Sequence, residues 1–345
     1  MSLKFVVLSL AALLIRVNCG VVGTDGKRFV ADQKPLCLIG FDAVWMMHMA
    51  SDPSSQDKVV SAFQEATKSG MNIARTRAFS ISADRALQTS PGVYNEDMLK
   101  GLDFLISEAG KNGVYLILSL VNNWKVYGAK KQYSNGQTIK NDNEFFTSSV
   151  TKGYYKDHVK AVLTRKNTRT GVAYKDDPTI FARELVNEHR CESEPSGETF
   201  ERDSKEGLDG QSKHRSNPGG VLLGVDFISN NQVPPVDFAK MHVDPEYWLP
   251  KASEADQTAF VDKWVQAHIQ DSNTILNMPI ILGEFGKLSK SAGYSVAKRD
   301  SYFGMLYDAI YASSSNRGSC AGGLFWWVFA QGMDSLSDGY EVILD

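Results

Sequence analysis

Short apolar runs alternate with amphipathic stretches along most of this chain, and this alternation constrains the fold more than any other feature. The runs predict seven strands, at 35–44, 71–79, 114–121, 179–187, 236–242, 279–285 and 321–330. Stretches of helical period lie near 54–70, 95–113, 152–165, 254–275 and 299–313. Strands and helices in this order predict an α/β fold with a parallel sheet covered by helices. We expect the sheet to form a (β/α)8 TIM barrel.

The alternation is interrupted once, and an alternative fold has to be weighed. An open doubly wound sheet usually carries a glycine-rich phosphate turn after its first strand, and "GFDAVW" has none. Residues 192–220 are polar and offer neither a helix face nor a buried strand. The following stretch, 221–228 ("VLLGVDFI"), fits either a strand or the start of a helix. We therefore expect a barrel that is incomplete or irregular around its fifth strand.

The first 19 residues have the pattern of a secretory signal peptide. Lys4 precedes an apolar run at 5–15, and small residues offer a cleavage site before Gly20. A membrane anchor is the alternative, but the run is too short to span a bilayer comfortably. We expect a secreted protein of the extracellular space or cell wall, free of the membrane after cleavage, with residues 20–345 forming one barrel domain.

Bulk charge and cysteine content narrow the choice of partners. The 345 residues carry a net charge of −3, which does not favour a nucleic-acid partner. Cys19 should leave with the signal peptide, and Cys37, Cys191 and Cys320 are too far apart in sequence to suggest a disulfide scaffold. No Cys/His cluster predicts a zinc site. We expect free, buried cysteines and no bound metal.

Two acidic residues stand at the ends of predicted strands. Glu188 follows Asn187 at the end of the fourth strand, and Glu284 lies near the end of "PIILGEF". Chemistry in a barrel of this kind takes place at the carboxyl ends of its strands. Two carboxylates facing each other there can hydrolyse a glycoside, because one protonates the leaving oxygen while the other attacks or activates water. This reaction requires no cofactor.

Further polar and aromatic residues stand at corresponding positions. Arg75 lies on the second strand and can keep one carboxylate ionised, which leaves the other to act as the acid. His242 follows "DFAKM", although a lone histidine is more often structural than catalytic. A strand alternates faces, so only one of Trp326 and Trp327 should face the barrel mouth. Each residue alone has an ordinary structural explanation, but together they favour a glycosidase site.

Several stretches of the sequence resemble one family. They include "DDPTIFARELVNEHRC", "ILGEFGKLSK" and "AGGLFWWVFAQGMDSLSDGYEVIL", which are similar to the plant endo-β-1,4-mannanases of glycoside hydrolase family 5. The likeness runs from about Val22 to the C-terminus and is interrupted only after Cys191. It implies a (β/α)8 barrel that cleaves internal β-1,4 bonds of mannan, glucomannan or galactomannan with retention of configuration. The implied partner is this polysaccharide, and no protein partner is implied.

The resemblance also assigns roles to individual residues. It implies that Glu188 is the acid/base and that Glu284 is the nucleophile. Asn187 would bind the 2-hydroxyl of the sugar at the cleaved bond, Arg75 would support the nucleophile, and Trp326 would be the platform under the sugar ring. The other residues that would line the cleft are His242, Asn123, Trp124 and Trp45.

The chain departs from the family pattern at several positions. Arg77 and Arg183 stand where the family has Trp, His189 stands where it has Pro, and Asp244 stands where it has Tyr. Asp244 would raise the pKa of Glu284, and Arg183 would place a costly charge in the barrel wall unless it is paired. About one βα unit, on the order of 30 residues, is absent. The alternatives are therefore a catalytically impaired mannan-binding relative or a chain that folds poorly.

Overall fold

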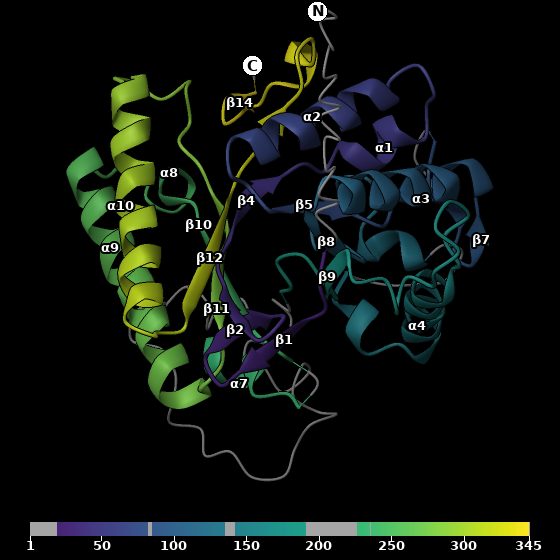
Figure 1. The fold of residues 1–345 in the computed structure, drawn as a ribbon, viewed down its shortest axis with the longest axis horizontal. Coiled ribbons are helices and arrows are strands. Elements are labelled where there is room, and N and C mark those ends of the chain that lie inside the picture. The colour runs from purple at the N-terminus through teal and green to yellow at the C-terminus, as the bar shows by residue number, and fades with distance from the viewer. Residues whose placement is uncertain (1–18, 82–84, 135–141, 191–225, 235, 345) are drawn as a thin grey trace, which may run out of the picture.

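A single parallel sheet organises the molecule. The structure, a computed structural model, describes residues 19–81, 85–134, 142–190, 226–234 and 236–344. Seven strands pair in the order β10-β11-β12-β4-β5-β8-β9 and curl into an open barrel (Figure 1). Their bounds are β4 (Leu38–Asp42), β5 (Ile73–Arg77), β8 (Tyr115–Ser119), β9 (Ile180–Glu184), β10 (Ala239–Val243), β11 (Ile280–Phe285) and β12 (Cys320–Phe325). Each corresponds to one of the predicted strands.

The strand order confirms that the irregularity falls at the fifth position of the barrel. The first four strands along the chain end at β9, the next strand is β10, and these two form the outer edges of the sheet. Within the described residues, neither edge pairs with a further strand. Residues 192–220 and 221–225 lie outside the described set. Asp226 caps the short helix α7 (Phe227–Asn231), so the described end of the ambiguous stretch is helical.

Helices cover the outside of the strands. α2 (Gln56–Lys68), α3 (Glu96–Lys111) and α4 (Ser149–Thr164) lie on one side, and α9 (Glu254–Asp271) and α10 (Val296–Ser315) lie on the other (Figure 1). The predicted start of α3 is confirmed, because the Asn95 side chain accepts hydrogen bonds from the backbone N–H groups of Asp97 and Met98. Shorter helices are α1 (Met46–Ala50) and α8 (Pro245–Trp248).

Small sheets that sequence patterning did not predict surround the barrel. Their strands are β1 (Val22–Asp25), β2 (Arg28–Ala31), β3 (Lys34–Leu36), β6 (Gln88–Ser90), β7 (Val93–Tyr94), β13 (Val328–Phe329) and β14 (Val342–Ile343). The β1–β3 sheet contacts the amino-terminal end of the barrel. There the buried ring of Phe29 packs edge-on against Phe181 and Phe238, at centroid distances of 5.1 and 5.3 Å.

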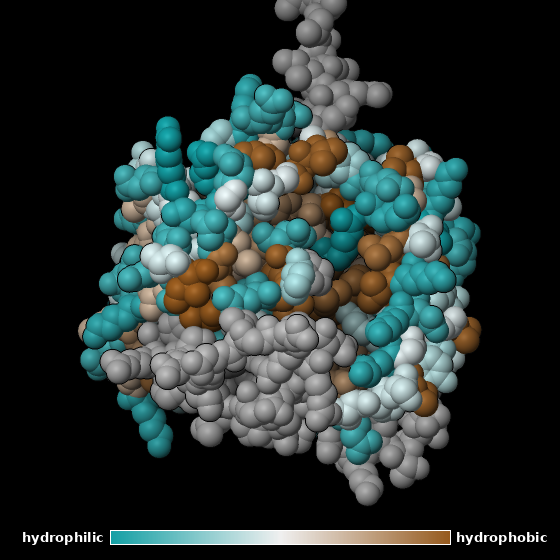
Figure 2. Space-filling model, turned by 90° about the horizontal axis from the view of Figure 1, so that it is seen from below, coloured by the Kyte–Doolittle hydropathy of each residue, from teal (hydrophilic) through white to brown (hydrophobic). Residues whose placement is uncertain are grey.

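Among the described residues, no helix combines the length and apolar character that a bilayer crossing requires. On the face seen from below, apolar side chains are interspersed with polar ones outside the grey atoms (Figure 2). The described cysteines Cys19, Cys37 and Cys320 are free; Cys19 and Cys320 are buried and Cys37 is half-buried. Cys191 lies outside the described residues.

Arg77 and Arg183, the two arginines expected to depart from the family pattern, have different environments. Arg183 lies on the edge strand β9, as expected for the barrel wall, and is half-buried. Its Nε is buried without a hydrogen-bond partner among the described residues, and burial lowers its pKa. Its Nη2 donates to the carbonyl oxygen of Tyr174 at 2.5 Å. Arg77 is only 4% exposed and stacks its guanidinium on the Tyr127 ring at 3.6 Å. Burial lowers the pKa of Arg77 to about 10.

Candidate active site

The carboxyl ends of four strands bring the predicted site residues together. Arg75 lies on β5, Glu188 follows β9, His242 lies on β10 and Glu284 lies on β11. A carboxylate oxygen of Glu188, a carboxylate oxygen of Glu284 and a ring nitrogen of His242 all lie within 4.8 Å of one another. With Trp326 and neighbouring residues, the two carboxylates and His242 line a cavity of about 150 Å³. The pair of carboxylates predicted from sequence therefore shares one cavity.

Arg75 is the centre of a buried hydrogen-bond network. Its side chain is almost wholly buried, and its Nη1 donates to Glu284 Oε1 at 2.5 Å and to Asp42 Oδ1 at 2.7 Å. Its Nε and Nη2 donate to Glu184 Oε2 at 2.9 and 2.6 Å, and Nη2 also reaches Asn187 Oδ1 at 2.7 Å. The guanidinium thus orients both Glu284 and the carboxamide of Asn187.

The Glu284 carboxyl has a raised pKa. Burial is the main cause, and the nearby acids Asp42 and Glu188 add to it, while His242 and Arg75 act in the opposite direction. The pKa of the fully buried Asp42 is itself raised to about 7 by burial, against the lowering effect of Arg75. Two acids with raised pKa values therefore share one guanidinium, and Arg75 holds one carboxylate oxygen of Glu284 by a hydrogen bond.

Glu188 has the opposite electrostatic environment. Burial acts to raise its pKa, but hydrogen bonds and charges from His242, Trp124 and Arg190 outweigh it and hold the pKa at about 2. His242 Nδ1 lies 3.0 Å from Glu188 Oε1, and the Trp124 indole Nε1–H donates to Oε2. Arg190 stacks on the Trp124 ring at 4.6 Å. In the free site Glu188 is therefore an ionised acceptor.

The Asn187 carboxamide is oriented from two sides. Its Oδ1 accepts from Arg75, and its Nδ2 donates to Asn122 Oδ1 at 3.1 Å. Asn123 contacts it through the backbone, because the Asn123 N–H donates to the Asn187 carbonyl at 3.1 Å. Both hydrogen-bonding groups of the amide have fixed partners, so the side chain can present only one orientation to a ligand.

The two adjacent tryptophans stack on each other. The ring centroids lie 4.8 Å apart with an interplanar angle of 11°, and the peptide bond between Trp326 and Trp327 is cis. The Asp338 carboxylate accepts hydrogen bonds from both indole N–H groups, at 3.0 and 3.1 Å. Trp327 is 5% exposed whereas Trp326 lines the cavity. One ring of the pair is in the core, as expected. The two side chains do not point to opposite faces of a strand, however, because their rings stack on each other.

Comparisons with known proteins decide the family. The model of glycoside hydrolase family 5, β-mannosidase-like, matches residues 20–338. This chain belongs to that family. Mannan endo-1,4-beta-mannosidase 4 of Solanum lycopersicum is 48% identical over 351 residues, covering 95% of this chain and 88% of the relative. A putative mannan endo-1,4-beta-mannosidase 9 of Oryza sativa subsp. japonica is 47% identical, covering 100% of this chain and 92% of the relative.

Solved structures of the family agree with the fold. The endo-1,4-beta-mannanase of Rhizomucor miehei has a TM-score of 0.75 at 24% identity, covering 94% of this chain and 95% of that one. The endo-beta-1,4-mannanase of Thermotoga petrophila has a TM-score of 0.76 at 24% identity, covering 90% and 74%. The match to the rice relative runs over 376 residues although this chain has 345, so the chain lacks residues that this family member has.

Two positions where the chain departs from the family lie at the site. Asp244 lines the cavity and caps the start of α8. Its carboxylate accepts a hydrogen bond from the Tyr340 hydroxyl at 3.4 Å, and burial raises its pKa to about 6. The main causes that raise the pKa of Glu284 are burial, Asp42 and Glu188, so the effect of Asp244 on Glu284 stays a prediction. His189 lies 3.0 Å from Asn230 through its Nε2, and burial lowers its pKa to about 4.

Not every predicted cleft residue reaches the cavity. Trp45 is 3% exposed, belongs to the core and donates its Nε1–H to the Val328 carbonyl at 2.7 Å. Trp124 reaches Glu188 from the rim and is 37% exposed. Glu188, His242 and Glu284 also offer a set of donors that a divalent cation could bind. Our interpretation needs no metal there, because two carboxylates suffice for glycoside hydrolysis.

Sequence reasoning missed several members of the network. Asp42 lies near the end of the first predicted strand, 35–44, so a signal like that of Glu188 was present there too. Glu184 lies inside the apolar run that ends at Glu188, and Lys240 lies inside "DFAKMH". A charge within a buried strand is a usable signal, because it must have a partner.

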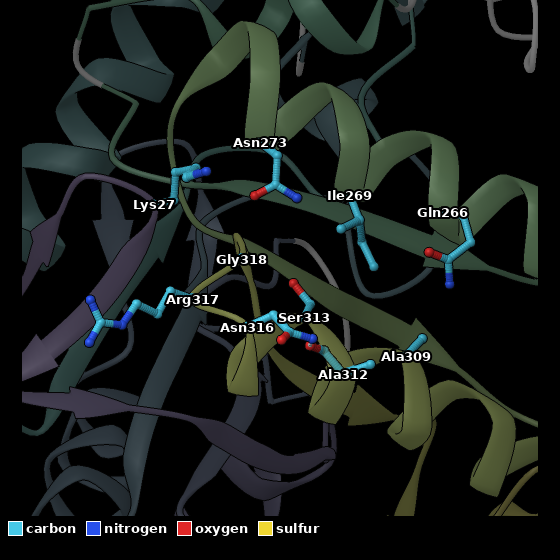
Figure 3. A pocket seen from close by; sticks show the side chains of 10 residues that line it. All are labelled: Lys27, Gln266, Ile269, Asn273, Ala309, Ala312, Ser313, Asn316, Arg317 and Gly318. Atoms are coloured by element: carbon cyan, nitrogen blue, oxygen red, sulfur yellow. Dashed lines mark hydrogen bonds between the residues drawn. The ribbon is translucent and has the colours of Figure 1, made fainter.

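A larger cavity lies at the opposite end of the strands. It measures about 370 Å³ and lies between the C-terminal ends of α9 and α10, with Lys27 and Arg317 at one side (Figure 3). Gly318 in its wall precedes β12, so the cavity faces the amino ends of the strands. It contains no carboxylate and lies away from the residues described above. Size alone therefore does not identify the active site of this chain.

Proposed function

We propose that this chain is a retaining endo-β-1,4-mannanase that hydrolyses internal β-1,4 bonds of mannan, glucomannan and galactomannan. The observation that carries the proposal is the approach of Glu188 and Glu284 to within 4.8 Å in one cavity. Retaining glycosidases place their two carboxyl groups about 5–5.5 Å apart, whereas inverting enzymes need about 6.5–9.5 Å to accommodate a water. The printed names of the relatives support the substrate class.

In this proposal Glu284 is the nucleophile. It attacks the anomeric carbon of the sugar and forms a covalent ester, while Glu188 gives its proton to the departing glycosidic oxygen. Glu188 then removes a proton from water, which hydrolyses the ester. Arg75 holds Glu284 at 2.5 Å and so orients one carboxylate oxygen for attack. Trp326, which lines the cavity, offers its ring face to the apolar face of a sugar.

Protonation of Glu188 requires a change on substrate binding. In the free site its pKa is held at about 2, which suits an ionised base and not a proton donor. A sugar that displaces water raises the pKa of a carboxyl group by desolvation. A sugar oxygen that accepts a hydrogen bond from protonated Glu188, in place of the Trp124 donor, raises it further. We propose that the bound polysaccharide, not the free enzyme, sets the protonation state of Glu188.

Incubation of the purified protein with galactomannan tests the proposed function. Reducing ends should accumulate, and the first product should be the β-anomer by NMR, as retention requires. The α-anomer as the first product would contradict retention, and folded protein without turnover would contradict the activity itself.

A second candidate function is mannan binding without turnover. The observation that favours it is the low pKa of Glu188 together with the acidic Asp244 in the same cavity. Retention on a mannan affinity gel with no released product would support this candidate. Product release that disappears in Glu188→Gln would reject it.

We further propose that the chain is secreted to the extracellular space or cell wall after removal of residues 1–19. Its basic and apolar start supports this, and residues 20–345 would then be the mature barrel domain. N-terminal sequencing of protein recovered from the medium of expressing plant cells tests it, with Gly20 expected as the first residue. An N-terminus upstream of the apolar run would contradict it.

A further inference from the structure

We propose that Lys240 is a positioning residue that reaches across the open side of the barrel and holds the nucleophile in place through Glu184 and Arg75. This inference rests on the proposed function, because it concerns the geometry of Glu284. Lys240 does not line the cavity described above and would not touch the sugar. Its effect on catalysis would be transmitted entirely by charge and hydrogen bonding inside the barrel.

The two edge strands approach each other through side chains. β9 and β10 are the outer strands of the sheet, and within the described residues they do not pair with each other. Side chains on the two strands, or on residues next to them, nevertheless form three contacts. These contacts follow one another from the amino to the carboxyl ends of the strands. They are Phe181 with Phe238, at 5.3 Å between ring centroids, Glu184 with Lys240, and Glu188 with His242 at 3.0 Å.

The middle contact is an ion pair in a largely buried position. The Lys240 Nζ donates to Glu184 Oε1, with the two side chains 18% and 10% exposed. The other carboxylate oxygen of Glu184, Oε2, accepts from Arg75 and from the Ser119 hydroxyl. Lys240 therefore holds one oxygen of Glu184 and leaves the second for Arg75.

The orientation of Glu184 determines the orientation of Arg75. Glu184 Oε2 accepts from both Nε and Nη2 of Arg75, at 2.9 and 2.6 Å, which fixes one edge of the planar guanidinium. The remaining nitrogen, Nη1, then points to Glu284 Oε1 at 2.5 Å. A rotation of Glu184 would turn the guanidinium and move the donor away from the nucleophile.

The charge balance of the cluster also requires Lys240. Arg75 forms ion pairs with three carboxylates, those of Asp42, Glu184 and Glu284. Lys240 supplies a second cation, and together with Arg75 it lowers the pKa of Glu184 against the effect of burial. Other titratable groups that sense Glu184 are His189 and Tyr155. Without Lys240, the three carboxylates would share one guanidinium.

The neighbouring strand is shaped to accept the lysine stem. A Cβ on Gly283 of β11 would lie 2.3 Å from Lys240 Cδ and 2.4 Å from Cγ. The aliphatic part of Lys240 therefore packs directly over a position without a side chain, beside Glu284 in sequence. This packing fixes the direction in which Nζ points and distinguishes Lys240 from a solvent-exposed lysine.

Steady-state kinetics of Lys240→Met on galactomannan tests the inference. We expect kcat to fall by about 10- to 100-fold, because small displacements of reacting groups have effects of this size. KM should stay within about threefold of wild type, since Lys240 makes no contact with the sugar. The acid limb of the kcat/KM profile should move to higher pH, because a positive charge has left the cluster. Lys240→Arg should restore most of the activity.

The controls separate this inference from the proposed function. Lys263→Met, at an exposed position of α9, should behave as wild type. The double variant Glu184→Gln/Lys240→Met removes both charges, so it should fold even if Lys240→Met does not. Its kcat should stay low because Arg75 has lost the Glu184 carboxylate that orients its guanidinium. Inactive wild-type protein would contradict the proposed function. If the wild type is active and Lys240→Met keeps its kcat and pH profile, the role of Lys240 is overturned. A wild-type kcat in the double variant would overturn it as well.

Discussion

His242 Nδ1 lies 3.0 Å from Glu188 Oε1, so the acid/base candidate of the free site already has a hydrogen-bond partner on one of its carboxylate oxygens. Trp124 donates to its other oxygen. Because donors to the charged form lower the pKa of a carboxyl group, the site stabilises ionised Glu188 until a ligand rearranges it.

Trp124→Phe should raise the pKa of Glu188. The change removes the indole N–H donor but keeps a ring on which Arg190 can stack. The acid limb of the kcat/KM profile follows the lower pKa of the free site, which is that of Glu188, so we expect this limb on galactomannan to shift upward by about one pH unit. A limb that stays in place, or moves downward, would show that Trp124 does not set the protonation state of Glu188.

Glu284→Gln and Glu188→Gln should each lower kcat on galactomannan by about 1,000-fold or more, because each removes one of the two groups that the proposed chemistry requires. Glu65→Gln, at a half-buried surface position of α2, is the matched control and should keep wild-type turnover. Substantial turnover in either active-site variant would mean that another group performs its role.

Arg77→Met should stabilise the protein. Among the described residues, Nε and Nη1 of the buried Arg77 have no hydrogen-bond partner, and no carboxylate pairs with it. Replacement of an unpaired buried charge by an apolar side chain of similar length should raise the free energy of unfolding by about 1–3 kcal/mol. Urea unfolding measures it, with the surface variant Arg299→Met as the control. A lower stability of Arg77→Met would indicate that the guanidinium has an essential partner.

His158→Gln should weaken the acid sensitivity of the fold. His158 is fully buried, and burial lowers its pKa to about 4 from the usual 6.5. Between these values the unfolded chain binds a proton that the folded chain does not, so stability falls as pH falls through this window. His158 should therefore account for a loss of about 3 kcal/mol in the free energy of unfolding as the pH falls from 7 to 4. Unfolding free energies at pH 5 and 7 should differ less in the variant, and an equal difference would contradict this.

The strand pattern was sufficient to predict the fold because buried parallel strands have a strong sequence signal. "VYLILSLV" is apolar throughout and corresponds to β8, which is buried at every position. The short β6 and β7 carry no such signal, since two or three partly exposed residues do not form a periodic pattern. Their pairing depends on contacts that only the folded chain provides.

The site was predictable where a carboxylate ended a strand and unpredictable where side chains met across the barrel. Glu188 and Glu284 were recognised because each ends an apolar run. The contact between Glu184 and Lys240 joins two strands that are not adjacent in the sheet, so no local spacing indicates it. Trp45 was expected in the cleft by resemblance, but its hydrogen bond to Val328 holds it in the core.

The most direct test is to trap the covalent intermediate. The protein is incubated with a 2-deoxy-2-fluoro-mannosyl fluoride, which slows hydrolysis of the ester, and its proteolytic peptides are analysed by mass spectrometry. We expect one added fluoromannosyl group on the peptide that contains Glu284, and none on the same peptide of Glu284→Gln. A label on the peptide that contains Glu188, or an active enzyme that acquires no label, would contradict it.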